Sequence, residues 1–144
     1  MNVGVSSACF YPLPTEETPV LIKNSGASIC EIFLETISEY EPDYTKPLKE
    51  KLDENGITPI SCHGISGLYE PMIFTDYQRR TDDCIKLFEK HAKATRALGA
   101  KYVTFHGTRT PTMSNNVDFE KFAKRMDILN KICEDNGVIF AWAQ

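Results

Sequence analysis

The chain has 144 residues, of which 42% are hydrophobic and 25% charged, and its formal net charge is −4. This length suits one domain with a substantial core, and the acidic balance argues against general binding to nucleic acid or acidic membranes. No apolar stretch approaches the roughly 20 residues needed to cross a bilayer, and the first residues lack the pattern of a secretory signal. We therefore expect a cytoplasmic, single-domain protein whose five scattered cysteines are reduced.

Strands and helices are predicted to alternate along the whole chain. Short apolar runs indicate the strands, and amphipathic spacing that follows N-cap residues indicates the helices. The predicted strands cover residues 2–10, 27–34, 57–63, 101–106 and 138–143. The predicted helices cover residues 15–24, 41–55, 75–98 and 118–134, and long loops are predicted over residues 64–74 and 108–116.

Four glycines mark the corners at which a predicted helix is followed by a strand. They are Gly26, Gly56, Gly99 and Gly137, and they lie 30, 43 and 38 residues apart, close to the length of one βα unit. Such repeats wind in one direction and form either a doubly wound sheet or a (β/α)₈ barrel. The first turn lacks a GxGxxG fingerprint, which argues against the dinucleotide-binding version.

Two histidines occupy matching positions at the ends of predicted strands. His63 follows Gly56 by seven residues, His106 follows Gly99 by seven, and each histidine is followed by glycine. Because the C-terminal ends of parallel strands share one edge, we expect both imidazoles at the same rim, where binding and catalytic residues are placed. The following glycines would let a ligand approach the backbone. The alternative is that both are rim histidines whose nitrogens are satisfied by hydrogen bonds.

Two further candidates lie on or beside these strands. Glu31 is a carboxylate in an otherwise apolar strand, and burying it is costly unless it is paired. It therefore either orients a substrate or forms a structural ion pair. Arg109, three residues beyond His106, is a candidate ligand for a substrate phosphate.

The predicted loop over residues 64–74 is long for a connection between a strand and a helix. Within it, Tyr69 is a candidate for stacking on a substrate, and Glu70 is a candidate for hydrogen bonding to it. The alternative is an ordinary surface loop. His91 lies in the middle of the following predicted helix, and we expect it to be structural.

Four segments, taken in order, resemble a known family. They are CEIFL at 30–34, KLDENGI leading to SCH at 51–63, ALGAKYV leading to FHG at 97–107, and CEDNGV at 133–138. Together they resemble the xylose isomerase-like TIM barrels, a group of sugar phosphate isomerases and epimerases that includes endonuclease IV. The resemblance implies an α/β fold of about four and a half parallel (β/α) repeats, which is an incomplete barrel because a whole one needs about 250 residues.

The resemblance also implies an activity. It points to a metal-dependent sugar or sugar phosphate isomerase or epimerase, in which a divalent ion (Mn, Mg, Co or Zn) polarises the substrate and an acidic residue moves a proton. In such members His63 and His106 contact the substrate, and Glu31 is placed to assist. In endonuclease IV-like members the same two histidines bind metal.

The family places a metal-binding Glu at the end of its fifth strand, and here that position falls just beyond Gln144. Most metal ligands are therefore expected outside residues 1–144. We expect this chain to be the N-terminal part of a barrel, truncated or encoded by a shortened gene, and to have no appreciable activity alone.

Two alternatives stay open. One is an endonuclease IV-like DNA repair nuclease, which fits both histidines but needs a basic stripe, and near this face the chain offers little beyond Arg109. The other is a non-catalytic half-barrel. Its open sheet edges and bare interior would be covered by a second copy, forming a homodimer, or by a separate C-terminal half.

Overall fold

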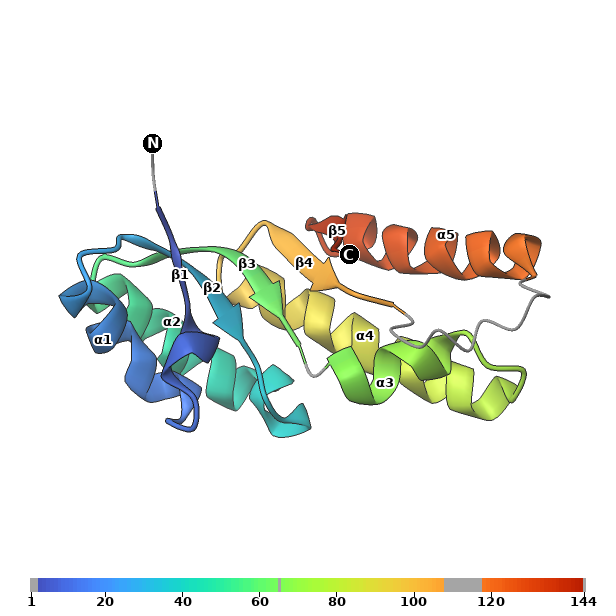
Figure 1. The fold of residues 1–144 in the computed structure, drawn as a ribbon, viewed down its shortest axis with the longest axis horizontal. Helices are drawn as coiled ribbons and strands as arrows, with labels where there is room; N and C mark the ends of the chain where they lie inside the picture. Colours follow the sequence, from blue (N-terminus) through green and yellow to red (C-terminus); the bar gives the residue numbers. More distant parts are fainter. Residues whose placement is uncertain (1–2, 65, 108–117, 144) are drawn as a thin grey trace.

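A computed structural model of the chain describes residues 3–64, 66–107 and 118–143. Its five strands form one sheet in the order β1-β2-β3-β4-β5, and every neighbouring pair is parallel (Figure 1). The strands are β1 (Val5–Ser6), β2 (Ile29–Phe33), β3 (Thr58–His63), β4 (Tyr102–Phe105) and β5 (Ile139–Trp142). The predicted α/β architecture of parallel repeats, matching part of a TIM barrel, is confirmed.

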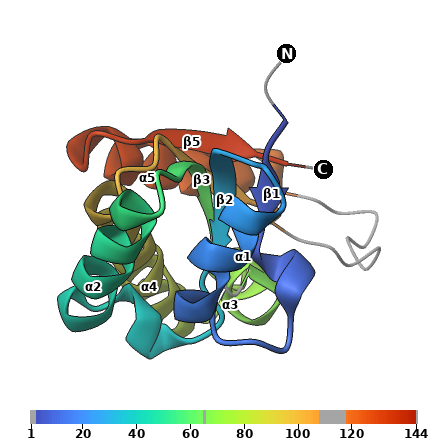
Figure 2. The same cartoon turned by 90° about the vertical axis from the view of Figure 1, so that its left-hand side faces the viewer.

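Helices connect successive strands and pack against one face of the sheet. Helices α2 and α4 contact each other, and α4 also contacts α5, which packs on β5 (Figure 2). None of the described helices combines the length and apolar character needed to cross a membrane. The α-helices are α1 (Thr18–Asn24), α2 (Pro42–Glu54), α3 (Ser66–Ile73), α4 (Gln78–Ala97) and α5 (Phe119–Asp135). Three short 3₁₀ helices are η1 (Ser7–Phe10), η2 (Thr15–Glu17) and η3 (Ile37–Tyr40).

The helix ends follow from local chemistry. Proline at the first position of α2 starts that helix without losing a hydrogen bond, because the first amides of a helix have no partner within it. The Asp118 side chain caps α5 by accepting a hydrogen bond from the Lys121 amide at 2.9 Å. Glycines with positive φ follow α1, α2, α4 and α5, as the sequence predicted.

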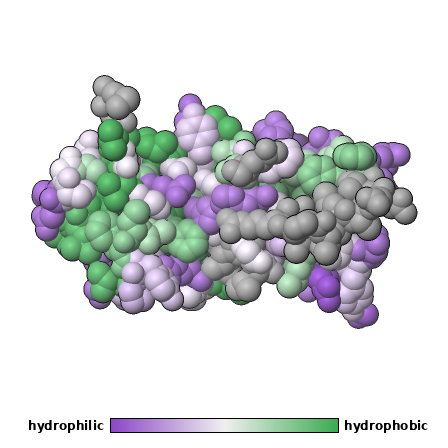
Figure 3. All heavy atoms as spheres, in the orientation of Figure 1, coloured by the Kyte–Doolittle hydropathy of each residue, from purple (hydrophilic) through white to green (hydrophobic). Residues whose placement is uncertain are grey.

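The core lies between the sheet and its helices. Alternate residues of the central strands, such as Ile32, Cys62 and Val103, are fully buried on this face. One apolar cluster joins β2 and β3 to α1 and α2, and a second joins β4 to α3 and α5, with α4 contributing to both. All five cysteines are free, and four of them are buried. Several exposed apolar side chains, among them Val3, Leu13 and Val20, lie in the N-terminal region, where Figure 3 shows an apolar surface around β1 and α1; others, such as Phe119 and Trp142, lie toward the other end of the chain.

The structure corrects two of the predicted elements. The strand predicted over 2–10 is limited to β1, because the chain turns into η1, where the Ser7 hydroxyl accepts a hydrogen bond from the Phe33 amide at 2.8 Å. The loop predicted over 64–74 contains α3, although Pro71 lies inside that helix. The loop predicted over 108–116 lies outside the described residues.

Candidate functional site

His63 and His106 meet at the C-terminal edge of the sheet. His63 is the last residue of β3, and His106 directly follows β4, the parallel neighbour of β3. Their Nε2 atoms are 2.6 Å apart, and their ring centroids are 4.7 Å apart. The prediction that both imidazoles lie at the same rim is confirmed.

The short contact makes the two imidazoles chemically unequal. A hydrogen bond between two ring nitrogens needs a proton on one of them and a lone pair on the other. One Nε2 therefore donates while the other accepts. His63 is only 9% exposed and stacks on Phe33 with the ring centroids 4.6 Å apart, whereas His106 is partly exposed. His106 is thus the more accessible member of the pair.

Glu31 lies on the sheet face opposite the helices, and hydroxyl groups from three other strands bind it. Its Oε1 accepts a hydrogen bond from Ser6 at 3.2 Å, and its Oε2 accepts from Ser61 at 3.0 Å and Thr104 at 3.4 Å. The described partners of Glu31 are thus hydroxyls, where an ion pair was the expected structural alternative. A hollow of about 360 Å³ over β1 to β3 is lined in part by Ser6, Glu31 and Ser61.

The sequence contains a signal for two of these hydroxyls. Ser61 and Thr104 each lie two residues before a strand-end position, Ser61 before His63 and Thr104 before His106. Side chains two apart on a strand point to the same face. Once the strand ends are known, the sequence therefore predicts that Ser61 and Thr104 lie on one face of the sheet.

Tyr69 and Glu70 are buried in α3, away from the surface of the rim. Tyr69 is 4% exposed, burial raises its pKa well above the usual value, and its hydroxyl lies 3.4 Å from His91 Nδ1. Glu70 is fully buried, and its Oε2 accepts hydrogen bonds from the amides of His106 and Gly107, both at 2.8 Å. The structure thus packs both side chains against protein groups, while Arg109 lies outside the described residues.

His91 is a core residue, as expected. It is fully buried, and burial lowers its pKa from 6.5 to about 4. Its Nε2 lies 3.2 Å from the carbonyl oxygen of Cys62, which can only accept, so Nε2 carries the proton. Nδ1 is then the acceptor for the Tyr69 hydroxyl.

Gly64 follows His63, and there is no space for a side chain on it. A Cβ at this position would overlap the Tyr40 hydroxyl and lie 3.1 Å from the His91 ring. On the side where a Cβ would stand, Tyr40 and His91 therefore occupy the space, and glycine is the residue that fits there. Gly107, after His106, differs: its φ is +71°, a conformation that favours glycine.

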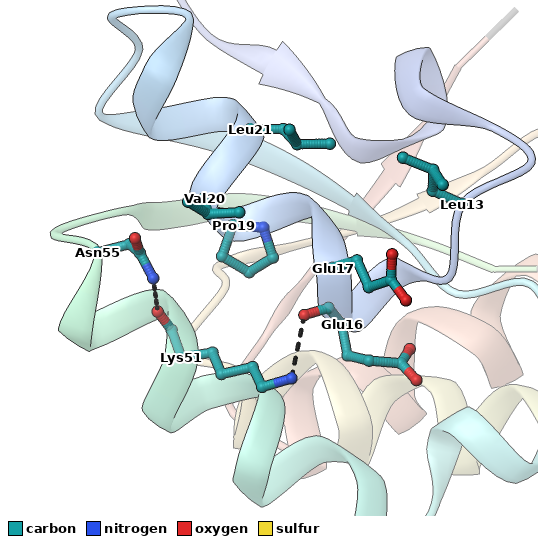
Figure 4. Close-up of a pocket in the computed structure, with 8 residues that line it drawn as sticks. All are labelled: Leu13, Glu16, Glu17, Pro19, Val20, Leu21, Lys51 and Asn55. Carbon is teal, nitrogen blue, oxygen red and sulfur yellow. Dashed lines mark hydrogen bonds between the residues drawn. The ribbon is translucent and has the colours of Figure 1, made fainter.

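A second hollow, of about 510 Å³, lies between α1 and α2 (Figure 4). Lys51 Nζ donates to the backbone carbonyl of Glu16 at 3.3 Å beside it, and the Glu16 carboxylate accepts from Tyr44 at 2.7 Å. The residues around this hollow come from η2, the two helices and their flanking turns, and none belongs to the strand ends.

The described residues do not by themselves fit the expected metal ion. Among residues 3–64, 66–107 and 118–143, no group of three or more His, Cys, Asp or Glu side chains is placed to hold one. His63 and His106 supply two imidazole nitrogens, fewer than the three or four protein ligands usual for zinc.

The family assignment comes from the sequence. The profile of the xylose isomerase-like TIM barrel family matches residues 20–142, and the chain belongs to this family. No curated protein matches the chain significantly.

Solved structures share the fold at low sequence identity. A D-psicose 3-epimerase from Clostridium cellulolyticum H10 matches with a TM-score of 0.79 and 18% identity, over 99% of this chain and 52% of its own. A 3-keto-D-glucoside 4-epimerase from E. coli matches at 0.75 and 18%, over 99% and 55%. A sugar phosphate isomerase/epimerase from Parabacteroides distasonis matches at 0.70 and 16%, over 98% and 50%. The chain therefore spans about half the length of these structures.

Proposed function

We propose that this chain supplies part of the substrate-binding rim of a sugar isomerase or epimerase. The observation that carries the proposal is the 2.6 Å approach of His63 and His106 at the ends of adjacent parallel strands. The family and the epimerases among the structures of the same fold support it.

The pair suits the oxygen atoms of a sugar. A donor nitrogen and an acceptor nitrogen side by side match a carbonyl oxygen and a neighbouring hydroxyl, the two groups that isomerisation exchanges. In this proposal the pair opens to bind and orient these oxygens. Glu31, Ser61 and Thr104 form a polar surface beneath the bound sugar. In this proposal the carboxylate of Glu31 assists proton transfer.

The finer parts of the proposal need groups outside the described residues. A divalent metal ion would polarise the carbonyl when bound. Its ligands other than His63 and His106 would have to come from outside the described residues. A sugar phosphate in place of a free sugar would need a cation such as Arg109.

Pairing of two copies through the open edges of β1 and β5 is also part of the proposal, and sedimentation of the chain tests it.

Sugar binding is the sharpest test, because it does not require turnover. We expect D-psicose or D-fructose to shift the NMR signals of His106, Gly107 and Ser61 in a saturable way. Loss of one hydrogen-bonding imidazole in His106→Ala should weaken this binding about tenfold. Glu50→Ala, which changes an exposed residue of α2, is the matched control and should bind as the unmodified chain does.

Four results bear on the choice of function. Sugar-induced shifts confined to other regions, or a His106→Ala variant that binds normally, would contradict the proposal. Salt-dependent binding to DNA that contains an abasic site would favour the nuclease instead. Assays of the 144-residue chain with Mn²⁺ or Co²⁺ are expected to show no sustained isomerisation.

A further inference from the structure

Helix α3 is linked to the ends of both histidine-bearing strands through two consecutive residues, to β3 by way of His91 in α4 and to β4 directly. Tyr69 donates to His91 Nδ1, and His91 Nε2 donates to the carbonyl of Cys62, the residue before His63. These contacts tie the helix to the end of β3 on its buried side.

The next residue, Glu70, reaches the end of β4. The backbone amides of His106 and Gly107 both point at its Oε2, each at 2.8 Å. Consecutive amides that converge on one oxygen form an anion-binding nest, and the positive φ of Gly107 is typical of such a nest. The sequence places Glu70 seven residues after His63, so one short segment links the two strand ends.

The burial of Glu70 indicates that its hydrogen bonds to the two amides are strong. A carboxylate with no solvent exposure is costly unless strong hydrogen bonds compensate it, and bonds from amides to a carboxylate are among the strong ones. These bonds act on the backbone of His106 itself. The position of the Glu70 carboxylate therefore fixes the backbone of His106, and with it the point from which the imidazole side chain extends.

We propose that Glu70 is a positioning residue for His106. As an internal anion in the nest formed by His106 and Gly107, it fixes the end of β4 so that the two imidazoles meet. Its effect on turnover rests on the proposed sugar chemistry, whereas its effect on the position of His106 does not. Because the nest is filled from within, an anionic group of a substrate is kept out of it.

Removing the carboxylate tests the proposal on the whole chain without a substrate. In Glu70→Ala, we expect the amide proton signals of His106 and Gly107 to move upfield and the Gly107 amide to exchange about tenfold faster. Cross-relaxation between the two imidazole rings should weaken. Added formate, a small carboxylate that fits the vacated nest, should move these signals back, and chloride at equal ionic strength should not.

Two other variants keep the test decisive. Glu70→Gln retains an oxygen acceptor without the charge, so it should fold and show smaller shifts of the same sign at His106 and Gly107. Leu52→Ala creates a cavity in the other apolar cluster, so it lowers stability without touching the nest, and formate should not restore it.

The overturning results are equally specific. A folded Glu70→Ala or Glu70→Gln chain with unchanged His106 and Gly107 amides and unchanged ring contacts would refute the positioning role. So would formate acting on Leu52→Ala as strongly as on Glu70→Ala. If sugar binding fails while these signals respond as expected, the proposed function is wrong and the role of Glu70 stands.

Discussion

The corner after β3 is held by side-chain packing, whereas the corner after β4 is held by hydrogen bonds to its backbone. Both carry a His-Gly pair. At the first, Tyr40 and His91 press against Gly64 and leave no room for a Cβ. At the second, Glu70 binds the amides of His106 and Gly107, and the glycine is favoured by its φ. The same dipeptide can thus be required for shape in one place and for backbone conformation in another.

The largest expected effect is a loss of stability in acid, which arises from His91 at the corner after β3. Because burial lowers the pKa of this residue from 6.5 to about 4, the unfolded chain binds its proton more readily than the folded chain between these values. The stabilisation from neutral His91 is complete above about pH 6.5 and is lost as the pH falls toward 4. We expect a loss of roughly 3 kcal/mol in the free energy of unfolding.

Urea denaturation between pH 4 and pH 7.5 measures this effect. The reference is His91→Gln, which does not titrate, so the difference between the two pH profiles isolates His91 from the carboxylates. Parallel profiles over this range would show that His91 does not change its charge on unfolding.

Gly64→Ala should give the next largest effect. The added methyl group would overlap the hydroxyl of Tyr40, a residue that is itself 4% exposed and stacked on His91, so neither neighbour can yield easily. Overpacking of this kind costs about 2 kcal/mol, measured as the change in the free energy of unfolding. Gly67→Ala in α3 is the control, since nothing lies within 4 Å of its added Cβ and alanine favours a helix. An equal loss in both variants would rule out the packing explanation.

Gly107→Ala should give the smallest loss of the three. Its added Cβ would make only an ordinary contact, 3.4 Å from Phe105, so the cost comes from the positive φ and is about 1 kcal/mol. Denaturation measures the loss, and NMR should show the His106 and Gly107 amides shifted at the same time. A larger loss here than in Gly64→Ala would reverse the assignment of the two glycines.

The sequence predicts the order of elements and the meeting of the histidines because both depend on local signals. Helix-stopping glycines and apolar runs place His63 and His106 at equivalent strand ends, and parallel pairing then brings them together. What the sequence did not predict depends on distant partners. Helix α3 contains Gly67 and Pro71, which usually interrupt helices, and it forms because Tyr69, Glu70 and Ile73 are buried against the rest of the chain.

Glu70 shows why site residues are harder to predict than elements. In the sequence it is an acidic residue in an apparent loop, which suggests a solvent-facing or substrate-facing side chain. Its described partners are backbone amides 36 and 37 residues away, and every residue except proline has such an amide, so the sequence does not point to this contact. Only the fold brings them together.

The adjacency of Tyr69 and Glu70 limits how the segment after β3 can change in length. Each residue added to a helix turns everything after it by about 100°. One insertion within α3 between Ser66 and Tyr69 would swing the phenol from His91 and the carboxylate from the end of β4 in the same step. The first turn of α3 is therefore fixed in length, and a protein engineer who extends this connection should insert residues elsewhere.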